Sequence, residues 1–291
     1  MSESVQESLP AAAAVPGQHK AGITQGWLLL GLGLAMLAAM LVLTIFAPLV
    51  APHDPSATSP DSLAPASAAH WLGTDSIGRD VLSRLIVGGR TTLLITVTAV
   101  LIALVAGLML GLAAGYLGGF ADEIIMRVLD VVFAFPVLLL AIAVVAALGP
   151  TVPNLILTIA IVYTPAMARV VRAPVLSVKQ WDHVEAARSV GMSEMRLVLC
   201  HILPIVASPI LVATSLTLSQ TIFTVTALSF LGLGPPPPDP NWGGMLSEAR
   251  QFMELAPLTV VGPAAAIVFA TLTFIIIANG LREVLDVGSV R

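Results

Sequence analysis

The chain has 291 residues, of which 57% are hydrophobic and 10% are charged, and its formal net charge is −4. About 25% of the residues of a soluble globular domain are charged, so this composition excludes a water-soluble fold. Several uncharged runs exceed the roughly 18 residues that cross a bilayer as a helix. These features predict an all-α polytopic membrane protein that has the lipid bilayer as a partner and no nucleic-acid partner. The single cysteine, Cys200, excludes an intramolecular disulfide.

The N-terminal part contains one predicted span between two polar segments. Residues 1–26 are rich in Ala, Ser, Gln and Pro, which predicts a disordered tail. The first transmembrane helix is predicted over residues 27–50, and Pro52 ends it because proline cannot continue the helical hydrogen-bond ladder. A polar segment rich in Ser, Ala and Pro follows at residues 51–90.

Five more spans are predicted in residues 91–281, which makes six transmembrane helices in all. Pro136 predicts a kink in the third span. Arg127 and Asp130, three residues apart near the start of that span, are expected to pair. A charged insert at about 169–204 separates the fourth span from the fifth, and residues 282–291 form a charged tail. The predicted boundaries of spans two to six are 91–116, 124–148, 152–168, 205–230 and 257–281.

The distribution of Lys and Arg predicts the orientation, because cytoplasmic loops of membrane proteins are enriched in these residues. A cytoplasmic N-terminus places nine of them inside and four outside. Both termini and the charged insert are therefore expected in the cytoplasm, and residues 51–90 outside it. The four outside are Arg79, Arg84, Arg90 and Arg250.

The charged insert is predicted to form two short helices that meet at a glycine. Residues 182–190 form the first, and Gly191 suits the position after its end, where a positive φ costs glycine nothing. Ser193 is expected to N-cap the second helix, with Glu194 in its first turn.

The order of residues in this insert resembles the EAA loop of permeases from importers of the ATP-binding cassette (ABC) family. The matching residues are Glu185, Ala186, Ala187, Gly191, Leu203 and Pro204. The resemblance implies that the loop receives force from a separate ATPase. The alternative is an ordinary solvated loop, because Glu-Ala-Ala alone is a common tripeptide.

The resemblance to the dipeptide, oligopeptide and nickel branch of these permeases covers about residues 27–286. It rests on residues 70–80, Ser83 and Arg84, and on the short blocks at 115–119, 134–136, 228–234, 241–243 and 280–282. Departures include Cys200, where the family often has Arg, and Ile205, where Asn is common.

This resemblance implies a type I ABC importer permease fold and a bacterial inner-membrane location. The implied partners are a second homologous permease, two ATPase subunits or domains and an extracytoplasmic solute-binding protein. The implied solutes are di- or oligopeptides, with nickel or a metal chelate as the alternative. The chain resembles the second of the two permease subunits.

The chain lacks the motifs that would supply its own energy or chemistry. Its two lysines, Lys20 and Lys179, follow His19 and Val178, so neither belongs to a P-loop. The five histidines form no His-Glu-x-x-His zinc motif. We expect no enzyme activity and no cofactor or metal in this chain, with ATP and Mg²⁺ bound by the partner ATPases. A secondary transporter or channel is the alternative class, but no predicted span carries a charge at mid-depth.

Two further groups of residues each allow two interpretations. The fifth span carries a polar stripe that either lines a translocation pathway or holds helices together through hydrogen bonds. It consists of Thr214, Thr217, Gln220, Thr221 and Thr224. The extracytoplasmic Gly78-Arg79-Asp80 either meets a solute-binding protein or caps a helix.

Overall fold

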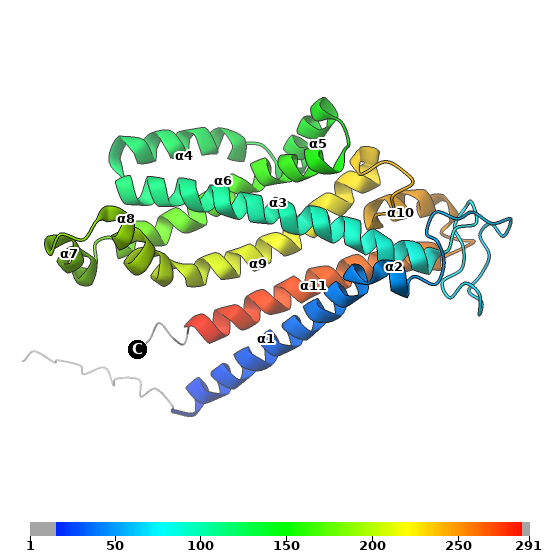
Figure 1. The fold of residues 1–291 in the computed structure, drawn as a ribbon, viewed down its shortest axis with the longest axis horizontal. Helices are drawn as coiled ribbons and strands as arrows, with labels where there is room; N and C mark the ends of the chain where they lie inside the picture. Colours follow the sequence, from blue (N-terminus) through cyan, green and yellow to red (C-terminus); the bar gives the residue numbers. More distant parts are fainter. Residues whose placement is uncertain (1–15, 287–291) are drawn as a thin grey trace, which may run out of the picture.

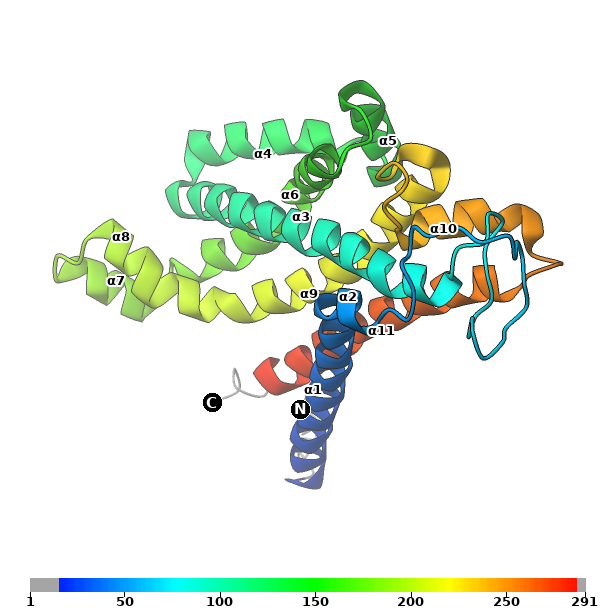
Figure 2. The same cartoon turned by 45° about the vertical axis from the view of Figure 1, so that its right-hand side comes forward.

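The computed structural model describes residues 16–286, which form long helices joined by loops and short helical segments. Five of the helices are long and apolar enough to cross a membrane, and a bent pair supplies a sixth candidate span. The predicted all-helical, six-span fold is confirmed. The five long helices are α1 (Pro16–Ile45), α3 (Val81–Leu117), α6 (Val152–Val178), α9 (Leu203–Leu228) and α11 (Leu258–Asp286). Helix α3 runs along the long axis in Figure 1, and α1 points away from α3 and α9 in Figure 2.

The third span is two helices rather than one kinked helix. Helix α4 (Gly119–Phe133) and helix α5 (Val137–Leu148) meet at 84°. Pro136 has the extended ψ of 129° and precedes α5, where its missing N–H leaves no internal bond unmade. The predicted pair of Arg127 and Asp130 is wrong, because Asp130 accepts a 2.5 Å hydrogen bond from Arg169 of α6.

Several helices begin earlier or end later than predicted. Residues 16–26 belong to α1, so the expected disorder there is wrong, while residues 1–15 lie outside the described residues. At Gly26, a Cβ would lie 2.8 Å from Cβ of Glu283 on α11, so the two helices are in close contact there. Helix α11 continues to Asp286, so residues 282–286 of the predicted tail are helical, and residues 287–291 lie outside the described part.

Helix α3 begins ten residues before the predicted second span. Asp80 caps its N-terminus by accepting a 2.8 Å hydrogen bond from the main-chain N–H of Ser83. Burial alone would raise the pKa of Asp80, but the hydrogen bonds from Ser83 and His70 outweigh it and hold that pKa below its usual value. The capping interpretation of this segment is thereby confirmed for Asp80.

Helix α6 runs on to Val178, so the first ten residues of the predicted charged insert are helical. Three glycines of α3 allow α6 to lie against it. An added Cβ would lie 2.4 Å from Cβ of Met167 at Gly107 and 2.5 Å from the carbonyl oxygen of Ala168 at Gly111. Glycines at this four-residue spacing let two membrane helices approach backbone to backbone. Gly115 continues the same stripe.

The two ends of the molecule carry different structures. Helix α7 (Asp182–Ser189) and helix α8 (Glu194–Leu197) lie at one end, while the loop 51–80 and helix α10 (Trp242–Ala249) lie at the other (Figure 1). At the loop end, Glu248 of α10 accepts hydrogen bonds from Arg79 at 2.7 Å and Arg84 at 3.0 Å. This ion-paired network joins the loop to α3 and α10.

Candidate functional site

The glycine bend predicted in the charged insert is present. Gly191 has φ of +81° and follows Val190, which is the C-cap residue of α7. The main-chain N–H of Met192 donates to the carbonyl of Ala187 at 3.3 Å, and that of Gly191 donates to Arg188 at 3.0 Å. These two bonds form a Schellman motif, which requires the left-handed backbone that glycine adopts without strain.

The second short helix is not a separate element, contrary to the prediction. Helix α8 passes through a π-helical turn, Val198–Ile202, into α9 without a break. The π turn precedes Pro204, whose missing N–H cannot join the regular ladder. Ser193 occupies the N-cap position of α8, but its side chain makes no capping hydrogen bond. The Gly191 bend therefore connects α7 to the N-terminal end of one continuous helix, which is formed by α8, the π turn and α9.

The loop divides into a buried face and an exposed face. Val184 and Leu197 are fully buried in a cluster that includes α6 and α9 side chains. The side chain of Ala187 is half-buried, whereas Glu185 and Ala186 are exposed. The carboxylate of Glu185 makes no hydrogen bond or ion pair within residues 16–286, so it is available to another chain.

Apolar side chains around the bend add to this exposed face. Val190 is 84% exposed and Met195 is 71% exposed, and Trp181 and Leu199 are also exposed. Exposed apolar groups rimmed by polar ones are typical of a protein interaction surface. We call the set Trp181, Glu185, Ala186, Val190 and Met195 the docking face.

Three basic side chains fix this loop to the ends of α3 and α4. Lys179 donates from Nζ to the carbonyl oxygen of Gly115 at 2.7 Å, which satisfies an unpaired carbonyl at the C-terminus of α3. Arg188 of α7 donates to the Tyr116 hydroxyl at 3.2 Å.

The third of these side chains, Arg172, forms two hydrogen bonds with the Asp122 carboxylate of α4, the longer at 2.6 Å. These anchors were not predicted from the sequence. The sequence offered one signal for them. Basic residues are scarce, with only two lysines in the whole chain, so each basic residue in the insert was a candidate for a specific contact.

The predicted polar stripe of α9 has two environments. Thr217, Thr221 and Thr224 are buried, Thr214 is half-buried and Gln220 is exposed. The hydroxyl groups of Thr224 and Tyr163 lie 2.9 Å apart and link α9 to α6. A hydrogen bond between side chains of two membrane helices is typical of helix association and not of a hydrated surface.

A hollow of about 430 Å³ lies beside part of the stripe. Its polar lining residues are Tyr163, Ser219, Gln220, Thr224 and Thr271. The structure therefore brings Gln220 and Thr224 to one cavity, whereas Thr217 and Thr221 are buried and are not among its lining residues. The assignment of a pathway to the whole stripe stays a prediction.

Comparisons with known proteins agree with these features. The model of the family "Binding-protein-dependent transport system inner membrane component" matches residues 107–288, and that of the "N-terminal TM domain of oligopeptide transport permease C" matches residues 31–65. The glutathione transport system permease protein GsiD of Shigella flexneri is 48% identical over 260 residues, covering 87% of this chain and 86% of the relative. The dipeptide transport system permease protein DppC of Alkalihalophilus pseudofirmus is 43% identical over 255 residues, covering 87% and 84%.

Solved structures show the same fold at lower identity. An inward-facing structure of the MetNI methionine ABC transporter matches with a TM-score of 0.56 at 19% identity, over 70% of this chain and 96% of that chain. An amino acid ABC transporter solved with histidines matches with a TM-score of 0.51 at 21% identity, over 66% and 90%.

Proposed function

Because this chain belongs to the family of binding-protein-dependent transport system inner membrane components, we propose that it is a permease subunit of an ATP-driven importer of di- or oligopeptides. The family membership supports the permease role. The glutathione and dipeptide permeases among its relatives support peptides as the solute. The permease itself performs no covalent chemistry, and partner ATPases bind ATP and Mg²⁺.

The observation that carries the coupling role is the continuity of α8 with α9 beyond the Gly191 bend. An ATPase that binds the docking face moves α7, and the Schellman motif transmits this movement to the end of α9. Because α9 is part of the core against α3, α6 and α11, a displacement at its end reorients the helix along its whole length. Alternating access to the two sides of the membrane follows from this movement.

The complex we propose contains a second homologous permease, two ATPase subunits or domains and an extracytoplasmic solute-binding protein. Both termini and the docking face lie in the cytoplasm of a bacterium, where ATP is available. The nine-to-four asymmetry of Lys and Arg supports this orientation. The loop 51–80 and α10, at the opposite end of the molecule, then face the solute-binding protein.

Reconstitution of the complete complex tests this function. The chain is co-expressed with its candidate permease, ATPase and binding-protein partners, and ATP-dependent uptake into proteoliposomes is measured. We expect uptake of glutathione or dipeptides but not of Ni²⁺. Uptake of Ni²⁺ alone would contradict the peptide assignment, and uptake without an ATPase would contradict the importer class.

Cysteine labelling tests the orientation separately. In a background in which Cys200 is replaced by Ser, a cysteine at the exposed position 190 is treated with an impermeant maleimide. We expect labelling in inverted vesicles and not in whole cells. Labelling from outside whole cells would contradict the proposed orientation.

A further inference from the structure

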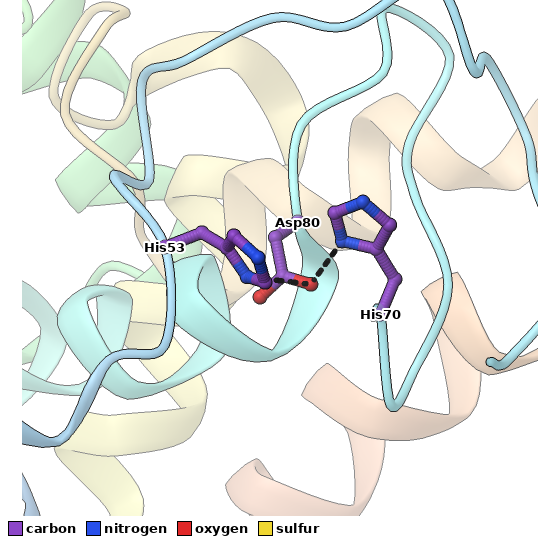
Figure 3. Close-up of side chains that lie close together, drawn as sticks. All are labelled: His53, His70 and Asp80. Atoms are coloured by element: carbon purple, nitrogen blue, oxygen red, sulfur yellow. Dashed lines mark hydrogen bonds and ion pairs between the residues drawn. The ribbon is translucent and has the colours of Figure 1, made fainter. Parts of the chain in front are cut away.

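Two histidines and an aspartate from distant parts of the sequence meet where the loop 51–80 joins α3. Nδ1 of His70 lies 2.9 Å from Oδ1 of Asp80, and Nδ1 of His53 lies 3.8 Å from the same oxygen. The two imidazole rings have centroids 4.8 Å apart, and both face the carboxylate (Figure 3). One nitrogen or oxygen atom from each residue lies within 4.8 Å of the other two.

The backbone holds each of these residues in place. His53 donates its main-chain N–H to Oγ of Ser83 at 3.0 Å, and that hydroxyl donates to Oδ2 of Asp80 at 2.7 Å. The main-chain carbonyl of His70 accepts from the N–H groups of Ser67 and Gly73 at 2.8 and 2.9 Å. Ser83 therefore orients Oδ2 of the carboxylate and leaves Oδ1 directed at the two rings.

The donor set has the chemistry of a transition-metal site. Two imidazole nitrogens and one carboxylate oxygen are common ligands of Zn²⁺ and of other divalent first-row metals. Ligand atoms about 2.0–2.1 Å from a tetrahedral Zn²⁺ lie about 3.3 Å from one another. The distances from Oδ1 of Asp80 to Nδ1 of His70 and of His53, 2.9 and 3.8 Å, lie on either side of that length.

We propose that His53, His70 and Asp80 bind a divalent transition-metal ion of the Zn²⁺ class, with water in the remaining position. The side chain of Asp80 is 2% exposed and that of His70 is 20% exposed, whereas that of His53 is 41% exposed. The ion therefore enters past His53, whose ring has the freedom to complete the coordination. Ser83 acts as a positioning residue that holds the carboxylate through its second oxygen.

Such an ion adds a link between three segments at this end of the molecule. His53 follows α2 (Ala47–Val50), His70 lies in the middle of the loop, and Asp80 caps α3. Metal binding therefore fastens the loop 51–80 to the start of α3 and stabilises the extracytoplasmic end of the molecule. This inference does not depend on the transported solute or on the ATPase partners.

Metal binding to the purified full chain tests the proposal. The chain carries a tag without histidines and is titrated with Zn²⁺ by calorimetry and with Co²⁺ by visible spectroscopy. We expect one ion per chain, a tetrahedral Co²⁺ spectrum and a higher Tm with Zn²⁺.

Matched variants separate this site from adventitious binding. His53→Ala and His70→Ala should each lose the stoichiometric ion and its Co²⁺ spectrum, while His183→Ala, on exposed α7, should retain both. Ser83→Ala should bind Zn²⁺ about 10–100-fold more weakly. Because His53 is half-exposed, His53→Ala remains a folded test even if His70→Ala does not fold. Unchanged stoichiometric binding in His53→Ala, or no binding by the wild-type chain, would overturn the proposal.

Discussion

Lys179 donates a 2.7 Å hydrogen bond from Nζ to the main-chain carbonyl of Gly115. This contact joins the residue that ends α6 to the last turn of α3, on the side from which the docking face projects. The carbonyl groups in the last turn of a helix lack internal partners, and a cation there also interacts favourably with the helix dipole. The contact therefore ties the end of α6 to the end of α3.

Replacing Lys179 by methionine should uncouple the loop from α3. The variant loses one hydrogen bond worth about 1 kcal/mol, so the chain should still fold and insert. We expect severalfold lower uptake with ATP hydrolysis maintained, measured in proteoliposomes that contain the full complex. The neighbouring Ser177→Ala, at an exposed position, is the matched control and should transport normally. An equal ratio of uptake to ATP hydrolysis in both variants would show that Lys179 does not hold the loop.

The positive φ of Gly191 predicts that a substitution there lowers uptake if the new residue does not adopt this backbone conformation easily. Gly191→Val should abolish uptake, because a β-branched residue at φ of +81° is strained by roughly 1–2 kcal/mol. A Cβ at this position meets nothing within 4 Å, so the lesion is conformational rather than a clash. Gly191→Asn should retain most uptake, since Asn tolerates the left-handed region. Glu185→Ala should be milder than Gly191→Val, because it removes contacts without strain.

The measurement for these three variants is uptake beside ATP hydrolysis and ATPase co-purification. Loss of uptake with the ATPase still bound would indicate uncoupling, and loss of the ATPase would indicate failed docking. Wild-type uptake by Gly191→Val would exclude this loop as the coupling element.

The stripe of α9 should separate into two classes of variant. Thr221 is fully buried, so Thr221→Leu overfills a packed position at a cost of about 1–3 kcal/mol and should lower the yield of assembled complex. Gln220 is exposed beside the 430 Å³ hollow, so Gln220→Leu should assemble normally and reduce uptake. Assembly is measured by co-purification with the partner permease. The reverse pattern would mean that Gln220 supports assembly and that Thr221 lines the pathway.

The glycine stripe of α3 should be intolerant of side chains. Gly111→Leu places a Cβ 2.5 Å from the carbonyl oxygen of Ala168, which forces α3 and α6 apart. We expect destabilisation of about 1–3 kcal/mol or more, seen as a lower Tm and less monodisperse protein. Gly31→Leu on α1 is the control, because a Cβ there meets nothing within 4 Å. Equal Tm values for the two variants would contradict the close α3–α6 contact.

The sequence by itself determined the class of protein and the position of the glycine bend. Long uncharged runs have one low-energy state in a bilayer, which is a helix that satisfies its own backbone groups. The φ of Gly191 also follows from local chemistry, because the Schellman motif involves only a few consecutive residues. Helix boundaries were less predictable because capping extends helices beyond their apolar cores, as Asp80 does for α3.

Only the tertiary structure decided which polar residues meet. Asp130 has Arg127 on its own helix but pairs with Arg169, 39 residues away, because α4 packs beside α6. The same holds for Lys179 with Gly115, and for His53 and His70 with Asp80. Their sequence separations carry no periodic signal, and the contacts exist because helices and loops pack in three dimensions.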